Sequence, residues 1–230
     1  HRHKVQRLHI EPISQASLNQ RAGRCGRVGP GTCIRLFAED EFSQRPEFTE
    51  PEILRSSLAN VILRMLSLKL GDVGRFPFVE RPEERALAEG FQTLAELHLI
   101  AEDRRRLLPE GRVAARIPID VKLARVLIDA RRHGALAECL VIAAFLSIQD
   151  PRERPAEARQ AADTAHAAFA DPQSDFLGAL NLWNAYDAAH QDLTQSKLRD
   201  WCESRFLNFL RMREWRELHR QLLLIVEELG

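Results

Sequence analysis

Near its N-terminus the sequence reads Gln20-Arg21-Ala22-Gly23-Arg24-Cys25-Gly26-Arg27. We expect a helix over residues 15–27, on which Gln20, Arg24 and Arg27 share one face because they are spaced at i, i+4 and i+7. A side-chain amide and two guanidinium groups pointing the same way can hold phosphate oxygens. Each glycine costs about 1 kcal/mol relative to alanine inside a helix, so the glycine pair indicates that a ligand or another domain approaches the backbone. The stretch therefore predicts a polyphosphate-binding segment, with Arg21 off its binding face.

The composition of the chain is that of an ordinary globular protein. Its 230 residues are 45% hydrophobic and 29% charged, and 33 basic residues balance 33 acidic ones. A net charge of zero does not by itself point to a nucleic-acid partner. Only four of the basic residues are lysine. This excess of arginine is explained either by a coding bias or by a need to recognise phosphates.

The four cysteines, Cys25, Cys33, Cys139 and Cys202, show neither zinc-ligand spacing nor a disulfide framework. We therefore expect a reduced, cytoplasmic setting and no metal ligands. No apolar run approaches the ~20 residues that span a bilayer, and no signal peptide is evident. The chain begins His1-Arg2-His3-Lys4, without methionine, and on this ground we expect it to be a fragment of a longer protein.

Local patterns divide the chain into three parts and predict a predominantly α fold with minor β structure. Residues 4–10 and 32–37 alternate like strands on either side of the expected helix at 15–27, which is typical of the end of an α/β domain. Helical patterns from residue 53 and over 83–97 precede a hairpin signal at 98–108, and helices followed by a hairpin indicate a winged helix. From residue 118 onward the pattern is helical, with helices expected over 156–170, 175–190 and 203–229 and a proline-bounded loop at 150–155.

The arginine stretch resembles motif VI of superfamily 2 helicases, and its leading Gln20 is similar to the DEAH-box branch. Flanking and distant segments resemble the bacterial HrpA type of DEAH-box RNA helicase along nearly the whole chain. These segments are Ile13-Ser14-Gln15-Ala16-Ser17, Gly29-Pro30-Gly31-Thr32-Cys33-Ile34-Arg35-Leu36-Phe37, Thr49-Glu50-Pro51-Glu52-Ile53-Leu54-Arg55, Ser174-Asp175-Phe176, Leu180-Asn181-Leu182-Trp183 and Arg211-Met212-Arg213-Glu214-Trp215-Arg216.

The resemblance implies three domains and an ATP-driven activity. The domains would be the C-terminal part of a second RecA-like domain (1–49), a winged helix (50–117) and a helical ratchet domain (118–230). The parent protein would be a hydrolase that moves 3′ to 5′ on single-stranded RNA, using ATP and Mg²⁺ held mainly by a first RecA-like domain. Arg27 would be the arginine finger on the γ-phosphate, Arg24 a second phosphate contact, and Gln20 would order the attacking water or the γ-phosphate. The candidates for RNA contact are Arg152, Arg154, Asn208 and Arg211.

The sequence also lacks two motifs that such an enzyme needs. It contains neither Gly-x-x-x-x-Gly-Lys-Ser/Thr nor an Asp-Glu-x-His box. We therefore expect this polypeptide to hydrolyse no ATP by itself. Separately, we expect it to be monomeric. Two alternatives stay open at this point: a nucleic-acid-binding or protein-interaction module with a degenerate phosphate site, and a DNA helicase of the same superfamily.

Overall fold

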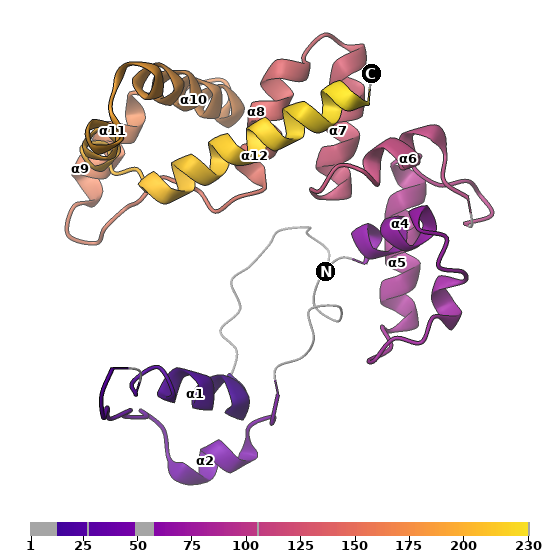
Figure 1. Cartoon of the computed structure of the whole chain (residues 1–230), viewed down its shortest axis with the longest axis horizontal. Helices are drawn as coiled ribbons and strands as arrows, with labels where there is room; N and C mark the ends of the chain where they lie inside the picture. The colour runs from indigo at the N-terminus through magenta and orange to yellow at the C-terminus, as the bar shows by residue number, and fades with distance from the viewer. Residues whose placement is uncertain (1–12, 27, 49–57, 105, 230) are drawn as a thin grey trace. The chain divides into compact units, whose positions relative to one another are not determined.

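The computed structural model describes residues 13–26, 28–48, 58–104 and 106–229, and it is mostly helical (Figure 1). Its two compact units are His1–Ser56 with Val79–Pro82, and Ser57–Phe78 with Glu83–Gly230. Within the described ranges, β structure is limited to two isolated bridges, Ile100 with Leu107 and Arg152 with Leu207. The predicted fold class, predominantly α with minor β, is therefore confirmed.

The first unit contains helices α1 (Gln15–Ala22) and α2 (Glu39–Gln44). The hydroxyl of Ser14 caps α1 by accepting a hydrogen bond from the Ser17 amide at 3.2 Å. The prediction of a helix over 15–27 is wrong in its second half, because α1 ends at Ala22. After it the amides of Arg24 and Cys25 bond three residues back, to Arg21 and Ala22, as in a tight turn. The two glycines that follow Ala22 favour such a turn over a continuing helix.

The two predicted strands of this unit have different outcomes. The strand at 4–10 lies outside the described residues. At 32–37 no strand forms, so that prediction is wrong. A strand needs a neighbour to bond its backbone, and no other described segment pairs with residues 32–37.

The second unit begins with α4 (Ala59–Ser67), the short 3-10 helix η1 (Val73–Arg75), α5 (Glu84–Glu96) and α6 (Pro109–Ala114). Helices α4 and α5 pack together around the fully buried Ile62 and Leu94. The hairpin predicted at 98–108 is confirmed in a short form: Ala101 donates its amide to the Arg106 carbonyl at 2.9 Å, and Leu108 donates to Leu99 at 3.0 Å. Helix α6 follows it and packs against α7.

The remaining helices form a bundle: α7 (Val121–Arg132), α8 (Leu136–Leu146), α9 (Arg159–Ala167), α10 (Asp175–Asp192), α11 (Gln195–Glu203) and α12 (Phe209–Glu228). Helix α8 contacts both α10 and α12. Trp215 of α12 is fully buried at this junction and donates its indole N–H to the Val141 carbonyl at 3.0 Å. Its ring centroid lies 4.9 Å from that of Phe145 and 5.1 Å from that of Trp183. One aromatic cluster thus joins three helices.

The long helix predicted over 203–229 is α12, but it begins only at Phe209; residues 204–208 separate it from α11, which ends at Glu203. Phe206 has a left-handed backbone with φ of 54°, which an α-helix cannot contain. The Asn208 side chain then caps α12 by accepting from the Arg211 amide at 3.1 Å. Among the described helices, none combines the length and the apolar character needed to cross a bilayer.

Candidate functional site

The arginine stretch presents two of its three predicted phosphate contacts to solvent. Gln20, in the last turn of α1, and Arg24, in the turn after it, are both exposed. Neither side chain has a hydrogen bond or ion pair with any residue that the structure describes. Because Arg24 lies beyond the helix, the spacing argument for a single helical face does not apply to it. Arg27 lies outside the described residues.

Two other arginines hold this segment in place. The guanidinium carbon of Arg45 lies 4.4 Å from the centroid of the Phe37 ring, and its Nη1 donates to the Ile13 carbonyl at 3.4 Å. Arg35 donates to the Asn19 side chain at 3.0 Å and lies over the Phe42 ring. These arginines are engaged by the fold, whereas the Arg24 guanidinium remains available to a ligand.

Three of the four predicted RNA contacts meet at the junction between the proline-bounded loop and the start of α12. Arg211 donates from Nη1 to the Asp150 carbonyl at 3.0 Å. The side chain of Asn208 donates from Nδ2 to the Glu153 carboxylate at 2.8 Å. The backbone N–H of Asn208 donates to the Pro151 carbonyl, also at 2.8 Å. The bridge between Arg152 and Leu207 closes the same junction. Loop and helix are thus tied together by groups that are 55 to 61 residues apart in sequence.

Both arginines of the loop are paired with carboxylates. Arg152 binds Asp150 through two nitrogens, with the shorter contact at 2.7 Å from Nη2 to Oδ2. Burial alone would raise the pKa of Asp150, but the hydrogen bonds from Arg152 outweigh burial and lower it. Arg154 lies apart from the junction and pairs with Asp163 of α9 at 2.6 Å. A phosphate would have to compete with these two carboxylates.

Sequence reasoning missed the residues that organise this junction. The carboxylate of Asp150 accepts a hydrogen bond from Arg152, and its backbone carbonyl accepts one from Arg211. In the sequence, an aspartate before a proline indicates only a loop. His166 of α9 lies 3.2 Å from the Phe206 carbonyl, joined through its Nε2. This contact ties α9 to the turn that precedes α12.

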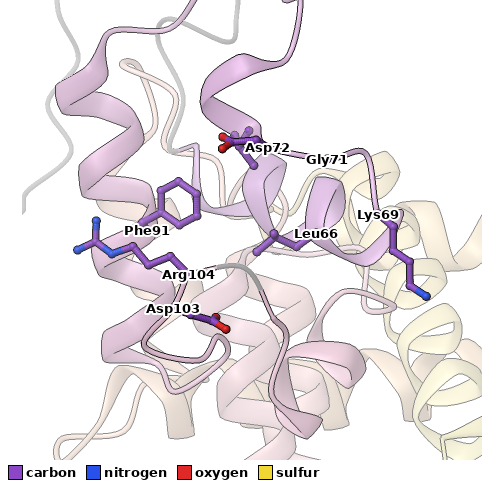
Figure 2. Close-up of a pocket in the computed structure, with 8 residues that line it drawn as sticks. Leu66, Lys69, Gly71, Asp72, Phe91, Asp103 and Arg104 are labelled. Atoms are coloured by element: carbon purple, nitrogen blue, oxygen red, sulfur yellow. The ribbon is translucent and has the colours of Figure 1, made fainter.

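The second unit also contains a hollow between the end of α4, helix α5 and the hairpin tip, with a volume of about 520 Å³. Figure 2 shows Leu66, Phe91 and Arg104 gathered around it, with Lys69 extending away from Phe91. The guanidinium carbon of Arg104 lies 6.0 Å from the Phe91 ring centroid. Among the described residues, no group of three histidine, cysteine or acidic side chains could hold a metal ion.

The chain is similar to known helicases over its whole length. Residues 120–179 match the family model described as "Helicase associated domain (HA2), ratchet-like". The ATP-dependent RNA helicase HrpA of Escherichia coli is 50% identical over 100% of this chain and 18% of its own length. The HrpA homolog of Haemophilus influenzae is 48% identical with the same coverage. The pre-mRNA-splicing factor ATP-dependent RNA helicase DEAH10 of Arabidopsis thaliana is 31% identical over 98% of this chain and 33% of its own length.

The chain is similar over its full length to a segment of the HrpA type of ATP-dependent RNA helicase. It spans 18% of the length of these two bacterial relatives. Its residues 120–179, which carry the HA2 match, contain α7 to α9 and the start of α10. The junction built on Asp150 therefore begins inside the helicase-associated domain and ends on α12.

Proposed function

We propose that this chain acts as part of an ATP-dependent RNA helicase that moves 3′ to 5′ on single-stranded RNA in the cytoplasm. The observation that carries this proposal is 50% identity to an ATP-dependent RNA helicase over the full length of the chain. In this proposal residues 1–49 complete a second RecA-like domain, 50–117 form a winged helix and 118–230 form the ratchet domain. In this proposal the chain alone is a monomer. It is inactive because its sequence contains neither a P-loop nor a DEAH box.

Gln20, Arg24 and Arg27 would hold the phosphates of ATP. The amide of Gln20 and the guanidinium of Arg24 are exposed and unpaired among the described residues, and such donors suit phosphate oxygens. ATP with Mg²⁺ would supply the transferable phosphoryl group, bound mainly by a first RecA-like domain. Arg27 would neutralise charge on the γ-phosphate, Arg24 would bind a second phosphate oxygen, and Gln20 would orient the attacking water or the γ-phosphate.

Arg152, Arg154, Asn208 and Arg211 would contact the RNA. The junction holds Arg152, Asn208 and Arg211 in fixed positions through hydrogen bonds to the loop, so little conformational entropy would be lost when RNA binds. Because Arg152 and Arg154 are paired with Asp150 and Asp163, a backbone phosphate would share these cations with carboxylates. We therefore expect each of these residues to contribute little to the affinity for RNA, so that binding depends on all four.

The test is RNA-stimulated ATP hydrolysis by the full-length parent protein. Replacing Arg27 by alanine is expected to lower kcat by ~10³-fold or more, as for other arginine fingers, and Arg24→Ala should also lower it. Arg21→Ala is the matched control, because Arg21 is exposed but is not assigned to a phosphate. Equal turnover in all three variants would contradict the helicase assignment and favour a binding module. Stimulation by DNA but not by RNA would favour a DNA helicase.

A further inference from the structure

A second hollow lies beside the one in Figure 2 and shares Leu66 and Lys69 with it. Its volume is about 520 Å³, and its apolar lining comes from the end of α4 and from the second arm of the hairpin, chiefly Leu66, Leu107, Leu108 and Pro109. We call this surface the α4–hairpin groove.

The charged residues that line the groove are all basic. Its lining includes Lys69, Arg106 and Arg112 but neither aspartate nor glutamate. Arg106 is paired with Asp103 at 2.7 Å, whereas Lys69 and Arg112 have no side-chain partner among the described residues. The acidic residue of α6, Glu110, is bound to Arg132 of α7 at 2.6 Å. Two free cations thus border an apolar hollow.

The groove is held rigid by close backbone packing. A β-carbon at Gly111 of α6 would overlap the Leu99 carbonyl, so α6 lies directly against the hairpin. This contact fixes Arg112 relative to Leu107 and Leu108. A preformed groove loses little entropy when a ligand binds.

The chemistry of the groove favours a peptide over a nucleic acid. Its floor is aliphatic and offers no aromatic ring for a base to stack on. Leucine or isoleucine side chains would bury apolar surface there, while carboxylates would meet Lys69 and Arg112 at the rim. We propose that the α4–hairpin groove is a docking site for an acidic, leucine-rich segment of a partner protein.

The test is fluorescence anisotropy of the full 230-residue chain with a fluorescein-labelled peptide, Glu-Leu-Glu-Glu-Leu-Leu-Asp-Glu. Saturable binding is expected, at least about tenfold tighter than for the same peptide with glutamine and asparagine in place of its acids. The double variant Lys69→Glu/Arg112→Glu is expected to weaken binding about tenfold or more. The matched control is Lys197→Glu, an exposed lysine on α11 away from the groove, which should bind like the unchanged chain.

Circular dichroism of each variant reports whether it folds, and a salt titration of the unchanged chain gives a second measurement that needs no variant. Binding should weaken as salt rises, because the cations are exposed. No saturable binding, no preference for the acidic peptide, salt-independent binding, or an equal loss in Lys197→Glu would each overturn the proposal. Anisotropy with a labelled oligouridylate gives one more outcome. If the double variant loses oligouridylate binding but keeps peptide binding, the proposal is also overturned.

Discussion

At the scale of single residues, Asn208 both caps a helix and binds a distant loop, and the local sequence indicates only the first of these roles. Its Oδ1 caps α12 and its Nδ2 binds Glu153. The sequence places an asparagine before an apolar run, which is a helix-start signal, yet the helix was expected from residue 203. Its second partner is 55 residues away in the chain, and no spacing rule reaches that far. Its RNA contact therefore stays a prediction, while its structural role is visible.

Replacing Asn208 by alanine is expected to lower the free energy of unfolding by ~1–2 kcal/mol, because an N-cap is lost and the Glu153 carboxylate loses a hydrogen bond. Urea unfolding followed by circular dichroism measures this change. Asn60→Ala is the control, since Asn60 is exposed inside α4 and alanine favours a helix. Equal stability of Asn208→Ala and the unchanged chain would contradict the role given to the cap.

At the scale of helices, Gly90 marks the place where α5 crosses α4 at short range. A β-carbon there would lie 2.7 Å from Cδ1 of Ile62 and 3.3 Å from the backbone nitrogen of Ala59. Ile62 is fully buried and has little space to move. By contrast, a β-carbon at Gly178 of α10 would lie 3.4 Å from the Phe169 carbonyl, an ordinary contact. An added β-carbon would therefore be too close to its neighbours at Gly90 but would fit at Gly178.

The two glycines are expected to respond to alanine in opposite directions. Gly90→Ala should destabilise the chain by ~1–3 kcal/mol through overpacking. Gly178→Ala should raise the free energy of unfolding by up to ~1 kcal/mol, because alanine is the better helix former. Thermal and urea unfolding of the two variants side by side measure both signs. A stabilised Gly90→Ala would show that α4 and α5 separate without loss of packing.

The helices were predictable wherever apolar periodicity and a cap agreed. The pattern over 83–97 corresponds to α5, and at the start of α7 Asp120, a residue type that favours this position, accepts the Lys122 amide at 2.8 Å. The errors fall where the backbone leaves the helix without a proline to mark it, at Gly23 and at the left-handed Phe206. Phenylalanine gives no local signal for that conformation, because tertiary contacts such as that of Glu153 with the Phe206 carbonyl impose it.

At the scale of the whole molecule, the sequence identified the two sets of candidate site residues but not how the fold engages them. The exposed Arg24 and the engaged Arg35 and Arg45 have the same side chain, and only the packing of Phe37 and Phe42 separates them. Likewise, Asp150 and Asp163 neutralise Arg152 and Arg154 through contacts that depend on the loop conformation. Composition and spacing give the available chemistry, and tertiary packing decides which groups remain free.

The bundle also buries two ionisable groups that should govern its alkaline stability. Tyr186 of α10 and Cys202 of α11 are both fully buried, and the Tyr186 hydroxyl has no hydrogen-bond partner among the described residues. Burial, together with the neighbouring Cys202, raises the pKa of Tyr186 to about 12, and burial raises the pKa of Cys202 to about 11. The ordinary values are 10.0 and 9.0. The folded chain thus keeps both protons at a pH where the unfolded chain releases them.

Stability is therefore expected to be full below about pH 9 and to fall as the pH rises toward 12, because the unfolded state binds fewer protons there. Urea unfolding across this range measures the loss, and Tyr186→Phe with Cys202→Ala should flatten it. The chain has one tyrosine, so the tyrosinate absorbance reports Tyr186 alone. Tyr186→Phe should also stabilise the neutral protein, since it removes a buried hydroxyl that lacks a protein partner. Titration of the folded tyrosine near its ordinary pKa would contradict its burial between α10 and α11.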